Sequence, residues 1–480
     1  MNKIALLSLI STSALSVLSA QNKKALPNVI FIMADDLGYA DVGFNGQSLI
    51  RTPHLDSLAR AGMQFSDFYA GCSVSAPSRA SLMTGMHTGH TQIRGNKEIK
   101  PEGQSPVADR MTLGRLFQGA GYRTGIFGKW GLGYPGSGAE ATDRGFDEFF
   151  GYNCQRMAHL YYPDHLWRGK ERVDYPTNVD GQHGVYSADE IHREALRFIE
   201  TSAKDNVPFF AMLTYTLPHA ELNLPHDAVY EYYEGKLTPK PYESRYKWDY
   251  PSSPNAHAAF AAMVERLDRY TGEVGALLRR LGIEERTLVI FTSDNGPHRE
   301  GGADPDYFDS NGVYRGIKRD LYEGGIRIPM AMAWKGKIAP GGKSQVPLAF
   351  WDFLPTFAEL IGQGAKAKGS DGKSFLSLLK GSAPSKSLLS RPLYWEFHED
   401  GGKMALRKGE WKLVALKVDT GSPVLELYNL ASDPSETKDL SASEPKRREQ
   451  LYREMLRMRT SSTDFPFAYE VKTQTERSAH

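Results

Sequence analysis

The stretch NVIFIMADDLG, residues 28–38, runs from an apolar, β-branched segment directly into two aspartates. Its first part predicts a buried strand, and Asp35 and Asp36 form an acidic loop at the strand's end. The stretch TLVIFTSDNG, residues 287–296, repeats this design. Two strands therefore finish in carboxylates at the same kind of end, which is the pattern of a parallel sheet with a functional edge.

Helical and extended patterns alternate between these two stretches. The predicted helices cover residues 53–61, 112–120, 187–200 and 257–281, and the further predicted strands lie near 123–127 and 208–215. This alternation predicts an α/β fold, with a large mixed, mostly parallel sheet sandwiched by helices. In such sheets, ligands bind beyond the carboxyl ends of the strands.

The sequence pattern changes after about residue 385, from alternating helical and extended segments to short extended ones. Short strand-like runs (RPLYWEFH, GKMALRKGEWKLVAL and VLELYNLASDP) precede a charged helix from Glu444 to Thr460. They predict a small antiparallel sheet with one helix. The expected organisation is a signal peptide at 1–20, a catalytic domain at 21–385 and a small α+β subdomain at 386–480, with a loop at 362–371 ahead of it.

Composition limits the classes of partner. The 480 residues include 58 basic and 57 acidic side chains, so the net charge of +1 gives no reason to expect binding to nucleic acid or to a membrane surface. The first twenty residues, MNKIALLSLISTSALSVLSA, have the pattern of a secretory signal peptide. We therefore expect an exported protein, periplasmic or secreted, without a membrane anchor. The two cysteines, Cys72 and Cys154, are expected to be buried and unpaired rather than joined in a disulfide.

Four side chains at the two strand ends are hard oxygen ligands: Asp35, Asp36, Asp294 and Asn295. If the strand ends converge, these residues make a Ca²⁺ or Mg²⁺ site rather than a zinc site. The alternative is that both acidic loops are simply solvated.

The stretch GCSVSAPSRASLMTG, residues 71–85, contains a thiol and several hydroxyls. Pro77 marks a helix start, so Ser75 lies at the end of the helix where free N–H groups favour anions. Arg79 adds a guanidinium that can hold an oxyanion. The alternative is ordinary capping of the helix by Ser75 or Ser78.

The string Ser75-Ala76-Pro77-Ser78-Arg79, followed by Thr84-Gly85, resembles the signature of the type I sulfatases of the alkaline-phosphatase-like superfamily. Further strings match motifs of this family in the expected order: Asp35-Asp36, Gly128-Lys129-Trp130, Pro218-His219, Asp294-Asn295-Gly296, and Lys318 ahead of Tyr322-Glu323-Gly324-Gly325. Cys72 does not fit the signature, because valine and not proline stands two residues after it. The nucleophile is therefore expected at Ser75.

The resemblance implies a calcium-dependent, arylsulfatase-like sulfuric ester hydrolase. Ser75 would be oxidised to formylglycine by a radical S-adenosylmethionine maturase before export, and the hydrate of that aldehyde would be the nucleophile. One Ca²⁺ ion would be held by Asp35, Asp36, Asp294 and Asn295, with residue 75 near or on the metal. The expected roles of the remaining residues are sulfate clamps for Lys129 and Lys318, support of the hydrate for Arg79, and general acid or sulfate ligand for His219.

One position departs from the family pattern. Many sulfatases carry a histidine after the Lys-Trp pair, where it is thought to deprotonate the hydrate, and this chain has Gly131 instead. His90, His159 and His298 are possible substitutes, and the sequence does not rank them.

The expected substrate is a sulfated sugar or oligosaccharide. The string 298–306 follows the predicted metal loop, so Arg299, Asp304 and Asp306 are candidates for recognising substrate hydroxyls. Aromatic residues are dense at 230–250 and 159–167, where they either form a sugar-binding wall or pack these insertions onto the sheet. Two other functions stay open: a phosphatase or phosphonate hydrolase that uses unmodified Ser75, and a carbohydrate-binding protein without activity.

Overall fold

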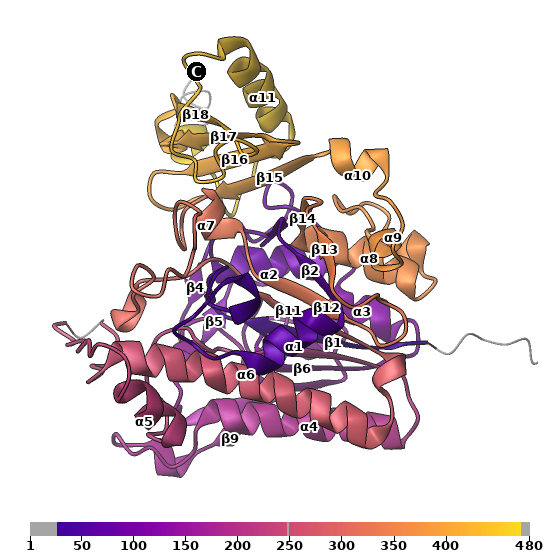
Figure 1. The fold of residues 1–480 in the computed structure, drawn as a ribbon, viewed down its shortest axis with the longest axis vertical. Helices are drawn as coiled ribbons and strands as arrows, with labels where there is room; N and C mark the ends of the chain where they lie inside the picture. Colours follow the sequence, from indigo (N-terminus) through magenta and orange to yellow (C-terminus); the bar gives the residue numbers. More distant parts are fainter. Residues whose placement is uncertain (1–25, 247–248, 472–480) are drawn as a thin grey trace, which may run out of the picture.

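The computed structural model describes residues 26–246 and 249–471, so the predicted signal peptide lies outside the described residues. Within the described part, a ten-stranded sheet forms the centre of the molecule, with helices on both faces (Figure 1). The strands across the sheet are, in order, β13 (Gly342–Ser344), β2 (Met63–Phe65), β12 (Met330–Ala333), β11 (Thr287–Ser293), β1 (Asn28–Ala34), β10 (Phe209–Thr214), β6 (Arg123–Lys129), β7 (Glu148–Tyr152), β8 (His165–Arg168) and β9 (Glu171–Asp174).

The sheet is mixed and mostly parallel in its middle. Strands β11, β1, β10, β6 and β7 pair in parallel, whereas β12, β8 and β9 pair antiparallel to their neighbours. Every residue of β1 is buried, and alternate side chains pack on opposite faces: Phe31 belongs to one apolar cluster and Ile32 to the other. A strand covered on both faces must be apolar throughout, which explains the continuous apolar run. The predicted fold class is confirmed.

Two groups of helices cover the sheet. Helices α1 (Pro53–Ala61), α4 (Ser187–Lys204), α5 (Ala228–Glu234) and α6 (Ala256–Leu281) pack on one face. Helices α2 (Ser75–Thr84), α3 (Leu113–Gln118), α8 (Phe353–Leu360), α9 (Leu376–Leu379) and α10 (Lys386–Ser390) pack on the other (Figure 1). The helices predicted at 53–61, 112–120, 187–200 and 257–281 are confirmed, with ends that differ by a few residues. The predicted loop at 362–371 contains a short 3₁₀ turn, Gly364–Ala367.

A second sheet lies at the C-terminal end of the chain. It is antiparallel and consists of β15 (Pro392–Phe397), β16 (Lys403–Lys408), β17 (Trp411–Leu416) and β18 (Val424–Asn429). Helix α11 (Pro445–Arg457) packs on one face of it through Leu451 and Met455. On the other face, Trp395 is buried against Tyr69 and Trp351, which belong to the part of the chain that precedes this sheet. The sheet and its helix are as predicted, and the domain boundary at residue 385 stays a prediction.

The remaining elements are short. Strand β3 (Phe68–Tyr69) pairs with β14 (Leu348–Ala349), β4 (Glu98–Ile99) pairs with β5 (Gly103–Gln104), and α7 (Glu323–Ile326) is a single turn. Among the helices of the described ranges, we find none with the length and apolar character to cross a bilayer.

Candidate active site

The carboxyl ends of β1 and β11 lie side by side at one edge of the sheet. Ala34 and Ser293 are partners in the parallel pairing, so the residues that follow them are brought together. The backbone N–H of Asp36 donates to Oδ1 of Asp294 at 3.1 Å, and Nδ2 of Asn295 donates to Oδ1 of Asp36 at 2.6 Å. Asp35, Asp36, Asp294 and Asn295 are all fully buried. The predicted convergence is therefore confirmed, and the interpretation as solvated loops is wrong.

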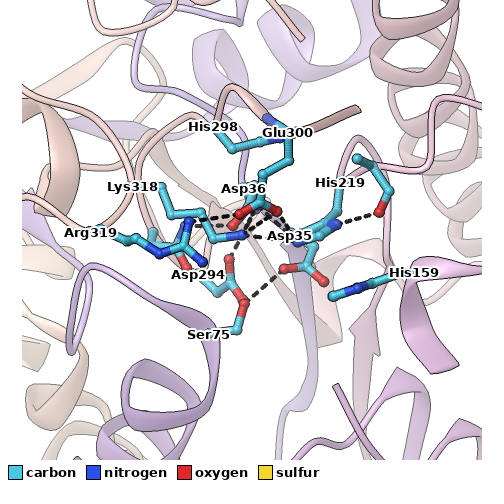
Figure 2. A network of polar contacts seen from close by, with 12 residues as sticks. Asp35, Asp36, Ser75, His159, His219, Asp294, His298, Glu300, Lys318 and Arg319 are labelled. Carbon is cyan, nitrogen blue, oxygen red and sulfur yellow. Dashed lines mark hydrogen bonds and ion pairs between the residues drawn. The ribbon is translucent and has the colours of Figure 1, made fainter. Parts of the chain in front are cut away.

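Helix α2 begins at Ser75 and points its first residue at these carboxylates. Val74 is the N-cap residue, and neither Ser75 nor Ser78 caps the helix with its side chain, so the capping interpretation of these two serines is wrong. The Ser75 hydroxyl donates instead to Oδ1 of Asp35 at 3.0 Å (Figure 2). Ser78 donates to the backbone carbonyl of Asp294 at 2.5 Å, which fixes the helix against the end of β11.

Three cationic side chains surround the carboxylates. Lys129, the last residue of β6, places its Nζ 2.7 Å from Oδ2 of Asp35 and 3.3 Å from Oγ of Ser75. The Arg79 Nη2 lies 2.8 Å from Oδ2 of Asp294, and its Nη1 donates to the backbone carbonyl of Lys129 at 2.9 Å. Arg79 therefore supports the metal-ligand candidates and the lysine from beneath.

Lys318 forms a second ion cluster above Asp36. Its Nζ lies 2.8 Å from Oδ2 of Asp36, 3.0 Å from Oε2 of Glu300 and 3.0 Å from Nε2 of His219. Oε1 of Glu300 accepts a hydrogen bond from Arg319 at 2.8 Å. Glu300 and Arg319 were not predicted as site residues, although Glu300 stands inside the string that the sequence singled out.

Burial and charge act against each other at the carboxylates. Burial by itself would raise the pKa of Asp35, but Lys129 and Arg79 outweigh it and hold this pKa well below its usual value. Burial and the neighbouring charge of Asp35 raise the pKa of Asp294 to about 7. Burial lowers the pKa of Lys129, although Asp35 opposes that shift. At Asp294, the neighbouring cations Arg79 and Lys129 therefore do not fully offset burial and the negative charge of Asp35.

Three imidazole rings form a stack beside the carboxylates (Figure 2). His219, in the loop after β10, lies between His159 and His298, with ring centroids 4.3 and 5.2 Å away. Its Nδ1 lies 2.5 Å from the carbonyl oxygen of Ala220 and so donates to it. Its Nε2 lies 3.1 Å from Oδ2 of Asp36.

A cavity of about 630 Å³ opens over this arrangement. Ser75, Lys129, His219 and Lys318 lie at its base. Its walls include Asn96, Gln104, Gln155, Arg156, His159, Tyr250, Glu300 and Arg319. All nine predicted site residues thus lie in or directly beneath one cavity, and their chemical roles stay predictions.

The side chains predicted to read substrate hydroxyls lie elsewhere. Arg299 forms an ion pair with Asp306 at 2.7 Å, and both side chains are exposed. Asp304 accepts a hydrogen bond from Lys240 at 2.6 Å. None of these three residues is among the described residues that line the cavity. Glu300, from the same stretch 298–306, does line the cavity. The path of the loop decides which residues of this stretch face the cavity.

A side chain at position 131 would collide with Gln155 and would need a left-handed backbone. Gly131 has a φ of +69°, and a Cβ added there would lie 2.1 Å from Nε2 of Gln155. Gln155 comes from the loop after β7 and donates to the Gly131 carbonyl at 3.2 Å. Of the three histidines considered as substitutes, His90 instead pairs with Asp371 at 2.9 Å, whereas His159 lines the cavity.

The aromatic residues of the two insertions divide between packing and the cavity. Tyr161 and Tyr233 are buried in the apolar core, as the packing interpretation predicts. Tyr250 and His159 line the cavity. Trp248, which the sequence also singled out, lies outside the described residues.

The cysteines take no part in the site. Cys72 and Cys154 are both free and buried, as predicted. The Cys72 thiol donates to the carbonyl oxygen of Glu396 at 3.5 Å, and burial raises its pKa to about 12. Such a thiol is inert as a nucleophile.

The mixed sheet, the buried carboxylates at its strand ends and the helix that begins at Ser75 define the class of the protein: a hydrolase of the alkaline-phosphatase-like superfamily. The family model named Sulfatase matches residues 27–363, and the model named N-sulphoglucosamine sulphohydrolase, C-terminal, matches residues 312–461. The chain therefore belongs to the sulfatase family, and it is a sulfuric ester hydrolase.

Individual relatives agree with this membership. Human arylsulfatase A is 30% identical over 460 residues, covering 86% of this chain and 83% of its own length. The N-acetylgalactosamine-6-O-sulfatase of Bacteroides thetaiotaomicron is 28% identical over 478 residues, covering 87% of this chain and 90% of its own length. The crystal structure of Ps i-CgsB in complex with k-i-k-neocarrahexaose is 29% identical, with a TM-score of 0.75, covering 92% of this chain and 94% of that one.

Proposed function

We propose that the protein hydrolyses sulfate esters of carbohydrates, using one calcium ion and a nucleophile made from Ser75. The observation that carries the proposal is the position of the Ser75 hydroxyl, 3.0 Å from Asp35 and 3.3 Å from Nζ of Lys129 at the base of a cavity. A nucleophile between a carboxylate cluster and a buried lysine suits an anionic substrate, because the cations neutralise its oxygens.

The donor set at the strand ends fits a hard cation. Three carboxylates and one amide converge without contact with solvent, and Oδ1 of Asn295 accepts no hydrogen bond from the described residues. Asp294, whose pKa is raised to about 7, gains most from an added positive charge. Asp35, Asp36, Asp294 and Asn295 would hold Ca²⁺, which supplies charge neutralisation at the sulfate oxygens when bound.

Ser75 is the proposed precursor of formylglycine, whose hydrate offers a second hydroxyl that lets sulfate leave by C–O cleavage. A radical S-adenosylmethionine maturase would make this modification before export, and the signal-peptide pattern at 1–20 agrees with that route. Lys129 and Lys318 bind sulfate oxygens from the base of the cavity. Arg79 holds Asp294 and the Lys129 backbone in place.

His219 is proposed to protonate the leaving alcohol. Its Nδ1 is fixed by the Ala220 carbonyl, so the transferred proton would leave from Nε2, which lies between Lys318 and Asp36. The polar walls of the cavity suit a sugar rather than an apolar aglycone, since Asn96, Gln104 and Arg156 offer amide and guanidinium groups. Relatives named for a sulfated sugar support this class of substrate.

Mass spectrometry of the peptide that contains residue 75 tests the proposal, after co-expression with a maturase. We expect dehydrogenation of Ser75 and hydrolysis of sulfated sugars in preference to aryl phosphates. Ser81→Ala is the matched control for substitution of Ser75, because the Ser81 hydroxyl lies on the same helix and makes no hydrogen bond with the described residues. An unmodified peptide combined with hydrolysis of phosphates would contradict the proposal and favour the phosphatase.

A further inference from the structure

His159 stands in the cavity wall beside His219, with its ring nearly parallel to that ring at 13°. It ends the 3₁₀ turn Met157–His159 and lines the same cavity as Ser75 and Lys129 (Figure 2). Its Nδ1 lies 3.2 Å from the hydroxyl oxygen of Tyr250. The direction of this hydrogen bond decides which ring nitrogen faces the cavity with a lone pair.

Glu300 sets that direction. Burial alone would raise the pKa of Glu300, but Lys318 and His219 outweigh it, so the carboxylate is ionised and only accepts hydrogen bonds. Burial raises the pKa of Tyr250, which therefore keeps its proton. The Tyr250 hydroxyl donates this proton to Oε2 of Glu300 at 3.1 Å. Its oxygen is then left to accept a hydrogen bond from Nδ1–H of His159.

A neutral imidazole carries one proton, so the tautomer with Nδ1–H leaves Nε2 as an acceptor. Burial holds the pKa of His159 well below its usual value, which keeps the ring neutral. Among the described residues, Nδ1 is the ring nitrogen of His159 with a hydrogen-bond partner. The lone pair of Nε2 is therefore free for a group in the cavity.

The other two rings of the stack are occupied differently. Nε2 of His219 is engaged by Lys318 and Asp36. Nδ1 of His298 accepts the backbone N–H of Glu300 at 3.1 Å, so its Nε2 carries the proton in the neutral ring. His298 is also absent from the described residues that line the cavity. His159 alone in the stack combines a neutral ring, an unengaged acceptor and a place in the cavity.

We propose that His159 accepts the proton of the side-chain hydroxyl at position 75 during turnover, an assignment that rests on the proposed function. In this step the O–H bond at residue 75 breaks and its electron pair stays on the oxygen. An N–H bond forms at Nε2 of His159, and the proton passes later to water in the cavity. Tyr250 is a positioning residue, because it holds the tautomer and does not itself exchange the proton.

The first test reads the tautomer in the unmodified, calcium-free full chain. In protein labelled with ¹⁵N-histidine, we expect the His159 signals, identified by their loss in His159→Gln, to show a protonated Nδ1 and a bare Nε2. Tyr250→Phe removes the acceptor, so both tautomers should then be populated. A protonated Nε2 in the unsubstituted protein overturns the inference.

The second test uses the modified, calcium-loaded enzyme. His159→Ala should lower kcat by about 10²- to 10⁴-fold, the usual contribution of a positioned base, and added imidazole should restore part of it. His257→Gln is the matched control. The His257 ring is buried and stacks on Tyr307, with ring centroids 3.8 Å apart, and it is not among the described residues that line the cavity. This variant should keep its kcat.

Two outcomes of the second test overturn the assignment: a kcat for His159→Ala close to that of the parent enzyme, or a loss that imidazole does not restore in a variant with an unchanged unfolding temperature. Failure of the parent enzyme on every sulfate ester contradicts the proposed function instead. That failure leaves the tautomer measurement unaffected, so the two proposals can fail separately.

Discussion

Oδ1 of Asp35 accepts a hydrogen bond from the Ser75 hydroxyl at 3.0 Å, while Oδ2 of the same carboxylate accepts one from Lys129 at 2.7 Å. One carboxylate at the end of β1 thereby connects the start of α2 with the end of β6. All three side chains are buried, so they are held by packing as well as by charge.

Ser75→Ala should abolish turnover, and Cys72→Ala should leave most of it. Ser75 faces the cavity, whereas the Cys72 thiol is buried behind it with a pKa raised to about 12. Steady-state kinetics with a sulfated sugar measures both variants. The reverse pattern would place the nucleophile at Cys72.

Removal of calcium should lower both activity and stability. A cation that binds the folded chain alone stabilises it by about 2.7 kcal/mol at one hundred times its Kd. Thermal unfolding with a chelator and with added Ca²⁺ measures this difference. Asp36→Asn, which removes one proposed ligand charge, should respond much less, and equal responses of the two proteins would exclude Asp36 as a ligand.

Gly131→Ala should destabilise the fold by roughly 1–3 kcal/mol, because the left-handed backbone and the contact with Gln155 both oppose a side chain there. Gln155→Ala added to this variant should recover the steric part and leave the backbone part. Chemical denaturation of the single and double variants gives the coupling. Strictly additive effects would show that Gln155 does not fill this space.

Lys412→Met should be strongly destabilising. The Lys412 Nζ lies 2.9 Å from a carboxylate oxygen of Glu323 and 2.9 Å from one of Glu436, and all three side chains are fully buried between the two sheets. Breaking a buried ion cluster costs about 3–5 kcal/mol. Lys408→Met, whose lysine pairs with Glu454 at the surface, should cost about 1 kcal/mol or less. Equal losses in urea unfolding would contradict the prediction.

Stability should fall as the pH drops below about 6.5, with a contribution from His87. Burial lowers the pKa of His87 to about 4, although Asp371 opposes the shift. The unfolded chain therefore takes up this proton first, and folding loses up to about 3 kcal/mol between the unfolded and folded pKa values. The free energy of unfolding of His87→Gln should depend less on pH in this range, and an unchanged slope would refute the assignment.

Much of the site could be predicted because strand ends obey a simple rule. Asp35 and Asp294 follow long apolar runs, and parallel neighbours bring such positions to one edge. Ser75 and Lys318 could be named through local strings. Glu300 and Arg299 stand next to each other in the sequence, and nothing local distinguishes the one that faces the cavity. Gln155 and His159 belong to a loop whose path is set by its packing.

By itself, the sequence determined the α/β sheet, the identity of the charged strand ends and the helix start at Ser75, because periodicity, turn chemistry and short motifs are local properties. The tertiary structure decided which strands are neighbours, that Gln155 fills the space at Gly131, and that the Tyr250 hydroxyl lies within hydrogen-bond distance of both Glu300 and His159. These relationships join residues far apart in the chain, and only the packed fold sets their distances.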